Sequence, residues 1–145
     1  MRGLKIILAS VLLVNLFSCR PSCCVDYSID VSLKVLDSNG KNLLADPAVY
    51  TKNNIETYNV TNGNARINLG SMNAPEIVKD VNGEPYLRLF LHFDRNEKRS
   101  LTLIKFGDKT TDTIAGEFKY SGNSVLLQKV WFNGVLKSPS FIVVK

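Results

Sequence analysis

Short runs of alternating apolar and polar residues, separated by turn-forming residues, recur along the chain from residue 27 onward. In the clearest run, residues 27–36, Ile29, Val31, Leu33 and Val35 fall on one face, and the residues between them are polar or charged. This period of two is typical of a β-strand that buries one face in a core. No sustained period of 3.6 residues follows the first 26 residues. The pattern therefore predicts an all-β domain.

Turn signals divide the rest of the domain into similar lengths. Asn62-Gly63 and Asn133-Gly134 each stand between two β-prone runs, which is a strong signal for a β-hairpin. Residues 125–132 are apolar on both faces, with Val125, Leu127 and Trp131 on one, so we expect this strand to be central. The expected strands are residues 27–36, 55–60, 65–69, 86–93, 101–106, 111–120, 125–132 and a return strand that ends at 141–144.

Seven to eight short strands at this spacing favour an antiparallel β-sandwich over residues 27–145, either immunoglobulin-like or transthyretin-like. A small closed barrel is the alternative. The segment Asp37-Ser38-Asn39-Gly40 superficially resembles the start of a calcium loop, but the twelfth position of such a loop would be Ala48, which cannot bind a metal ion. We therefore interpret the segment as a turn.

The first 18 residues read as a signal helix that is removed. Arg2 and Lys5 precede an apolar run over residues 6–17. As a helix this run would span about 18 Å, which is short of the roughly 30 Å of hydrocarbon in a membrane. The run ends in Leu16-Phe17-Ser18-Cys19, which resembles a bacterial lipobox. That resemblance implies cleavage before Cys19 and attachment to the membrane through acyl chains on Cys19. An ordinary secretory signal is the alternative.

Residues 19–26 read as a lipidated tether, because Pro21 and the lack of periodicity argue against a packed element. The lipobox, the alternating strand and the pattern Asp37-x-x-Gly40-x-Asn42-Leu43-Leu44 together resemble the small β-sandwich lipoproteins of Bacteroidota, a resemblance that implies no particular reaction. In other bacteria an Asp after the lipid-bearing cysteine retains the protein in the inner membrane, so Arg20 favours the outer membrane. Residues 20–25 contain no acidic residue, which favours a domain that faces the periplasm, with surface exposure as the alternative.

Charge and cysteine usage exclude further classes. Removal of Arg2 and Lys5 with the leader lowers the formal net charge from +5 to +3, and the remaining lysines are scattered, so no nucleic acid partner is expected. Cys23 and Cys24 are neighbours with Cα atoms about 3.8 Å apart, whereas ordinary disulfides need about 4.4–6.8 Å. We interpret them as part of the tether. A metal or redox site is the alternative, but no nearby His or Cys completes a set of ligands.

Catalytic residues are scarce. His92 is the only histidine, and although Asp94 follows it closely, a surface histidine is the favoured interpretation. No phosphate-binding loop, nucleophile elbow or metal motif occurs, so we expect neither cofactor nor metal and no enzyme. The alternative function is a small envelope hydrolase or thiol-redox protein that uses His92 or Cys23 and Cys24.

Aromatic residues supply the candidates for ligand contact. Trp131 and Tyr50 could stack on a sugar together with other tyrosines, although core filling is the favoured role for these aromatics. The sequence thus predicts a membrane-anchored envelope lipoprotein that acts as a non-catalytic binding or assembly module. Its expected partners are the membrane, reached through Cys19, and an envelope protein or glycan.

Overall fold

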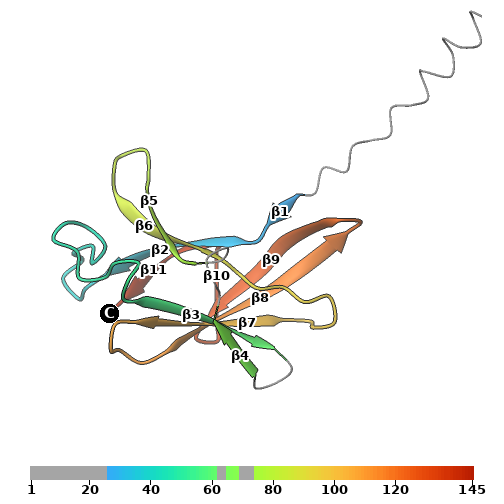
Figure 1. The fold of residues 1–145 in the computed structure, drawn as a ribbon. Coiled ribbons are helices and arrows are strands. Elements are labelled where there is room, and N and C mark those ends of the chain that lie inside the picture. Colours follow the sequence, from blue (N-terminus) through green and yellow to red (C-terminus); the bar gives the residue numbers. More distant parts are fainter. Residues whose placement is uncertain (1–25, 62–64, 69–73) are drawn as a thin grey trace, which may run out of the picture.

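Strands account for the whole regular structure of the described chain. The computed structural model describes residues 26–61, 65–68 (backbone only) and 74–145 (Figure 1). The leader, Cys19, Cys23 and Cys24 therefore lie outside the described residues. The strands are β1 (Tyr27–Ser28), β2 (Asp30–Leu36), β3 (Ile55–Thr61), β4 (Ala65–Asn68), β5 (Glu76–Lys79), β6 (Pro85–Phe90), β7 (Ser100–Phe106), β8 (Asp112–Ser121), β9 (Ser124–Phe132), β10 (Val135–Lys137) and β11 (Ser140–Val144).

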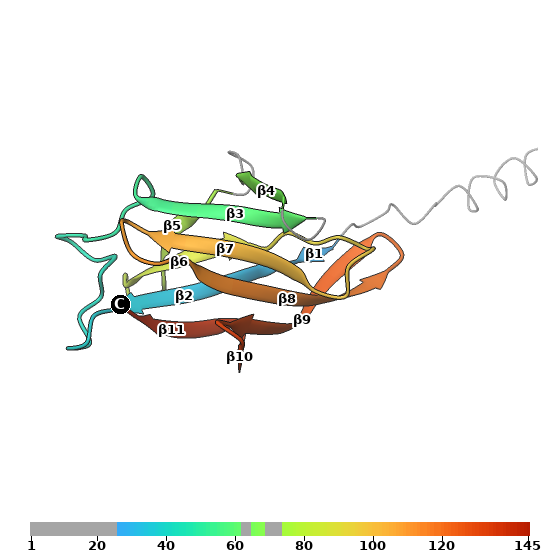
Figure 2. The ribbon, with the colours of Figure 1, turned by 90° about the horizontal axis from the view of Figure 1, so that it is seen from below.

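The strands form two sheets that pack face to face, which confirms the all-β sandwich (Figure 2). One sheet has seven strands, in the order β1-β9-β8-β7-β3-β4 with β10 also paired to β9, and the other has the order β11-β2-β6-β5. The strand number exceeds the expected seven to eight for two reasons. Two expected strands are each divided, into β1 and β2 and into β10 and β11, and β5 forms where no strand was expected.

The chain changes sheets near both of its ends. β1 pairs with β9 in the seven-stranded sheet, whereas β2 pairs with β11 in the four-stranded sheet, and both pairings are parallel. All other strand pairs in the described residues are antiparallel. The sandwich is therefore mostly antiparallel, as expected, and the expected direction was wrong only for these two pairs. Alternation along a strand reports which face is buried and not the direction of the neighbouring strand.

The core forms from the alternating faces that the sequence predicted. Val31, Leu33 and Val35 of β2 are at most 1% exposed, and Leu87 and Leu89 of β6 lie beside them. Full burial of each such side chain contributes about 1.5–3 kcal/mol. The seven-stranded sheet contributes Ile104, Phe106, Ile114 and Val130 from its inner face, among other residues.

A β-bulge in β9 explains why two predictions for this strand were wrong: the face on which Trp131 lies and the central position of the strand. Glu117 of β8 lies opposite Lys129, but the next residue, Phe118, lies opposite Leu127, so Gln128 is an extra residue in β9. Because the side-chain period of a strand is two, an extra residue reverses the faces that follow it. Val125 and Leu127 therefore point inward before the bulge, as do Val130 and Phe132 after it. Trp131 lies on the opposite face from Val125 and Leu127, contrary to the prediction.

The bulge explains the apolar character on both faces that suggested a central strand. In the structure β9 lies next to the edge, since its outer side pairs only with β1 at Val125 and Leu126 and with β10 at residues 130–132. The same arrangement confirms the hairpin at Asn133-Gly134, where both residues have positive φ, 48° and 81°. This conformation matches the two-residue hairpin turns in which Asn-Gly is preferred.

The turn after β2 also agrees with the prediction. Asp37 Oδ1 accepts hydrogen bonds from the backbone N–H groups of Asn39 and Lys41, both at 2.8 Å. Gly40 has a φ of 83°, which side chains with a Cβ rarely adopt. The carboxylate of Asp37 therefore holds its own turn.

Candidate functional site

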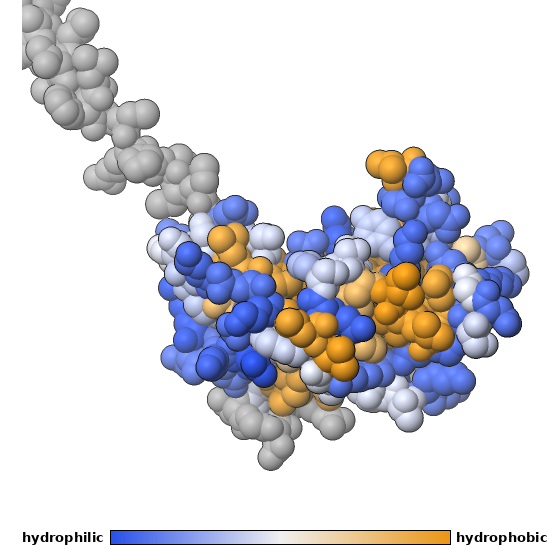
Figure 3. Space-filling model, turned by 180° about the vertical axis from the view of Figure 1, so that it is seen from behind, coloured by the Kyte–Doolittle hydropathy of each residue, from blue (hydrophilic) through white to orange (hydrophobic). Residues whose placement is uncertain are grey.

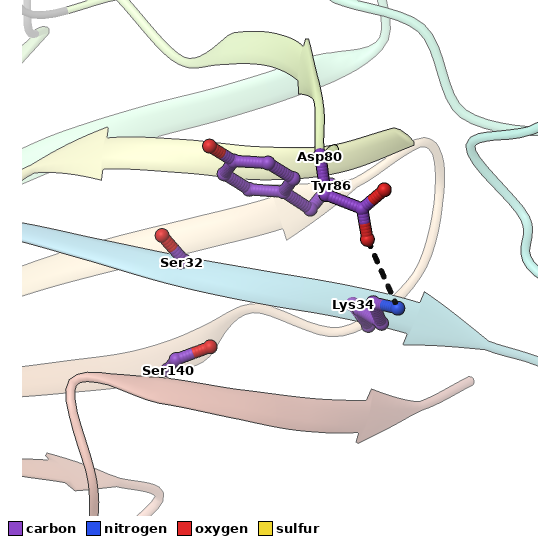
Figure 4. Close-up of a pocket in the computed structure, with 5 residues that line it drawn as sticks. All are labelled: Ser32, Lys34, Asp80, Tyr86 and Ser140. Carbon is purple, nitrogen blue, oxygen red and sulfur yellow. Dashed lines mark ion pairs between the residues drawn. The ribbon is translucent and has the colours of Figure 1, made fainter. Parts of the chain in front are cut away.

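A shallow pocket of about 310 Å³ lies on the outer face of the four-stranded sheet. Its lining combines two hydroxyls, an ammonium group, a carboxylate and a phenol ring, from Ser32, Lys34, Asp80, Tyr86 and Ser140 (Figure 4). The volume is near the lower limit for sites that hold small ligands.

Strand alternation and sheet order bring these five residues together. Ser32 and Lys34 occupy the outward positions of β2, between the buried residues of that strand. Ser140 of β11 lies directly opposite Ser32, and Tyr86 points outward from β6 on the other side of β2. Asp80 follows the last residue of β5. Four separate segments of the chain therefore contribute to one surface.

The Asp80 carboxylate is held in place by its own turn. Oδ1 accepts hydrogen bonds from the backbone N–H groups of Asn82 at 2.8 Å and Glu84 at 3.0 Å, which leaves Oδ2 to face Lys34 Nζ at 3.7 Å. The bonds from Glu84 and Asn82, followed by the charge of Lys34, lower the pKa of Asp80 below its usual value. Because its geometry is fixed before any ligand arrives, this carboxylate needs little reorganisation to bind one.

A second ion pair borders the pocket along β6. Arg88 Nη2 lies 2.5 Å from Glu76 Oε2 on the neighbouring strand β5, and the guanidinium also stacks over the ring of Phe90 at 5.3 Å. The hydrogen bond to Glu76 raises the pKa of Arg88. Charged side chains of β5 and β6 thus continue the polar surface beyond the pocket.

The chemistry of the pocket suits binding rather than bond cleavage. Its groups can donate and accept hydrogen bonds, and Tyr86 offers an aromatic ring for stacking. A serine nucleophile needs a neighbouring base. Within the described residues neither Ser32 nor Ser140 has a hydrogen bond from its hydroxyl to a histidine or a carboxylate. No group of three or more potential metal-ligating side chains occurs in that part of the chain.

The two aromatic residues predicted for ligand contact lie on different sides of the seven-stranded sheet. Tyr50 is only 5% exposed and packs in the core against Phe106, with ring centroids 5.3 Å apart. Trp131 is half-buried on the outer face of this sheet, where the guanidinium of Arg99 covers its ring at 3.9 Å. Neither residue borders the pocket on the other sheet.

Most of the aromatic residues considered for ligand contact do not fill the core, contrary to the expectation. Tyr50 alone of the group is buried there, whereas Tyr58, Tyr86, Tyr120 and Trp131 are half-buried at the surface. The Tyr120 hydroxyl donates a hydrogen bond to Asp94 O at 2.9 Å, and Tyr58 donates to Glu56 Oε2 at 2.5 Å. Amphipathic rings of this kind can pack by one edge and still reach a polar partner.

His92 and Asp94 do not form an acid–base pair. His92 lies just beyond β6, and its Nε2 atom is buried with no hydrogen-bond partner among the described residues. Asp94 Oδ1 instead accepts hydrogen bonds from the backbone and side-chain N–H groups of Asn96. Asp94 thus holds the turn that follows His92.

Sequence reasoning did not identify the pocket residues as a site. Alternation alone indicated that Ser32 and Lys34 point away from the core. Nothing in the chain order indicated that Ser140 and Asp80 would lie beside them, because that neighbourhood depends on the order of strands in the sheet.

Comparison of this chain with known proteins identifies no relative. A scan against protein-family models finds no matching family, and searches of curated proteins and of solved structures find no match either. Among the described residues, no helix is long and apolar enough to cross a membrane.

Proposed function

We propose that this chain is a lipid-anchored lipoprotein of the cell envelope that acts as a non-catalytic binding module. Its binding surface is the pocket on the outer face of the four-stranded sheet. The observation that carries this proposal is the Lys34–Asp80 ion pair, which lies beside Tyr86 in the pocket and in which backbone hydrogen bonds of the turn hold the Asp80 carboxylate. The ligand is a polar molecule, either a glycan or a segment of an envelope protein.

The position of the first strand supports a tethered arrangement. Asp26 O accepts a hydrogen bond from Val125 N at 3.0 Å, so the tether would join the domain beside the turn between β8 and β9 (Figure 1). β2 begins near the tether and runs toward the opposite end of the domain, where the loop after Leu36 lies. The turn at Asp80, between β5 and β6, lies at that opposite end as well. Residues 20–26 can span about 23 Å when extended. An anchor at Cys19 would therefore leave the pocket accessible from the side and from the far end.

Mass spectrometry of the full-length protein, expressed in a bacterium that processes lipoproteins, tests the anchor. We expect loss of residues 1–18 and addition of acyl mass at Cys19, with partition into the detergent phase. The outer membrane facing the periplasm is the proposed location. A Cys19→Ala variant that still partitions with the membrane would contradict the anchor.

Binding to a glycan array tests the pocket. Asp80→Asn keeps the oxygen that caps the turn but removes the charge, and Lys34→Met keeps the aliphatic stem but removes the ammonium group. We expect each variant to lose binding while Lys105→Met, on the outer face of the other sheet, retains it. Equal binding by all three variants would contradict the pocket as the site.

The competing proposal is a small hydrolase or thiol-redox protein that uses His92 or Cys23 and Cys24. The observation that favours this competing proposal is the buried Nε2 atom of His92. It has no hydrogen-bond partner among the described residues, and such an atom calls for an explanation. A folded variant with His92→Ala, Cys23→Ser and Cys24→Ser separates the two proposals. The binding module keeps its function in that variant, whereas the enzyme loses it.

A further inference from the structure

Three cationic side chains surround one carboxylate on the outer face of the seven-stranded sheet. Lys129 of β9 lies opposite Glu117 of β8, and Trp131 is two residues further along β9, on the same face. Arg99 directly precedes β7, the strand on the other side of β8, and Lys98 comes before it. We call these five residues the cationic cluster.

The Glu117 carboxylate holds two of the cations in place. Lys129 Nζ lies 3.1 Å from Oε1 of Glu117, and Arg99 Nε lies 3.8 Å from Oε2. The hydrogen bond from Lys129, followed by the charges of Lys129, Arg99 and Lys98, lowers the pKa of Glu117 below its usual value. The Glu117 side chain is 19% exposed, whereas those of Arg99 and Lys129 are each 53% exposed. A ligand that arrives from solvent therefore meets the cations before it meets the carboxylate.

Trp131 fixes the plane of the Arg99 guanidinium. The guanidinium carbon lies 3.9 Å from the centroid of the indole ring, which is a cation–π contact. The Nε atom pairs with Glu117, and the two Nη groups form no hydrogen bond or ion pair with a described residue. A guanidinium binds phosphate and carboxylate groups through two parallel N–H groups. The Nη edge of Arg99 is therefore oriented by its neighbours and available to an anion.

The cationic cluster has more positive charge than its carboxylate can balance. Lys98, Arg99 and Lys129 carry three positive charges around the single carboxylate of Glu117, which leaves a surplus of two. Within the described part of the chain, no other carboxylate forms an ion pair with any of these three cations. Hydrophilic side chains also predominate over the hairpin of β8 and β9, at the left of the view from behind (Figure 3). A charged ligand can therefore approach this end of the sheet over a polar surface.

We propose that the cationic cluster is a second binding site, which takes a phosphate monoester group. Such a group carries a charge of about −1.5 to −2 at pH 7 and three acceptor oxygens. It therefore matches the two surplus charges, the Nη edge of Arg99 and the ammonium group of Lys129. A carboxylate group offers a single charge and two oxygens, which is a poorer match. The site lies on the opposite sheet from the pocket, so it does not depend on the proposed binding function.

Trp131 supplies the measurement, because it is the only tryptophan of the chain. The full-length protein in micelles of a neutral detergent is titrated with a hexose 1-phosphate while the tryptophan emission is recorded. We expect a saturable change in emission. The free hexose, and sodium chloride at the same ionic strength, should give no such change, and a hexuronic acid should bind more weakly than the hexose 1-phosphate.

Substitutions assign the binding to the cationic cluster. Lys129→Met leaves Arg99 on the indole ring, so the emission still reports binding, and we expect the affinity to fall about tenfold through loss of a charge-assisted hydrogen bond. Arg99→Lys keeps the charge but removes the two parallel N–H groups, and calorimetry should show a similar loss. Lys34→Met, in the pocket on the other sheet, removes the same charge as Lys129→Met and should bind like the unchanged protein.

A second pair of titrations identifies the source of the phosphate, which is either a sugar or a lipid headgroup. Phosphatidic acid is added to the micelles, with phosphatidylcholine as the matched control. An emission change with phosphatidic acid alone, without a response to the hexose 1-phosphate, would assign the site to a lipid headgroup, and the reverse would assign it to a phosphorylated sugar. The absence of a response to both phosphates would overturn the proposal. Equal loss of affinity in Lys34→Met and Lys129→Met would overturn it too, as would a hexuronic acid that binds as tightly as the hexose 1-phosphate.

Discussion

Asp112 is one of the few charged side chains buried in this sandwich, and the residues around it satisfy both of its carboxylate oxygens. Asn133 Nδ2 donates to Oδ1 at 2.9 Å, and Lys145 Nζ donates to Oδ2. Removal of one member of a buried ion pair leaves the other charge without compensation. We therefore expect Lys145→Met to destabilise the fold by about 3 kcal/mol in urea unfolding, mostly through the stranded Asp112 charge.

The matched control removes both charges. Asp112→Asn keeps an oxygen for the Asn133 amide, and in combination with Lys145→Met it should recover most of the lost stability. A double variant as unstable as Lys145→Met alone would mean that packing, rather than charge, dominates at this position.

Asp80 gives the pocket a defined pH dependence. Its pKa in the folded protein is lowered from 3.8, first by the backbone hydrogen bonds from Glu84 and Asn82. The stabilisation from this carboxylate is therefore fully present above 3.8 and is lost as the pH falls through the lower folded value. NMR titration of the carboxyl carbon should find that the pKa stays below 3.8 in Lys34→Met, because the turn supplies the larger effect. A return to 3.8 in that variant would show that Lys34 alone lowers it.

At the residue scale the sequence predicted local chemistry well. The turns at Asp37 and Asn133 followed from residues that bond their own backbone or accept a positive φ. The environment of Tyr50 and of Asp112 could not be predicted in this way. Both depend on partners that are far along the chain, Phe106 for the ring and Lys145 for the carboxylate.

At the element scale, close packing at Gly116 of β8 shapes the inner face of the seven-stranded sheet. A Cβ atom there would lie 2.8 Å from the ring of Phe118 and 3.2 Å from a methyl carbon of Leu91. We expect Gly116→Ala to cost about 1–3 kcal/mol in urea unfolding, because the Phe118 ring must move. Adding Phe118→Leu should return part of that loss. No difference between the single and double variants would show that the ring is not the obstacle.

The strands illustrate what a pattern can and cannot predict at this scale. Alternation correctly identified the buried face of β2. It failed in β9, because the extra residue Gln128 reverses the pattern without leaving a Gly or Pro to mark the bulge. It also could not predict that β11 joins β2 in parallel, and this order is what assembles the pocket from Ser32 and Ser140.

At the scale of the whole molecule, the described core contains no cysteine. Apolar packing, rather than a disulfide bond within the core, must therefore stabilise the sandwich. We expect the melting temperature of the full-length protein to be the same in reductant and in the Cys23→Ser, Cys24→Ser variant. Far-ultraviolet circular dichroism should show β structure with a cooperative transition in both. A large drop in melting temperature on reduction would show that the tether cysteines stabilise the fold.

The central claim is that the outer face of the four-stranded sheet is the binding surface of a tethered module. Photo-crosslinking in intact cells tests it most directly, with p-benzoylphenylalanine in place of Tyr86 in the pocket and, as the matched control, in place of Tyr58 on the outer face of the other sheet. The account predicts a discrete crosslinked product from position 86 that disappears when Asp80→Asn is added, and no such product from position 58. The same products from both positions, or a position-86 product that survives Asp80→Asn, would contradict it.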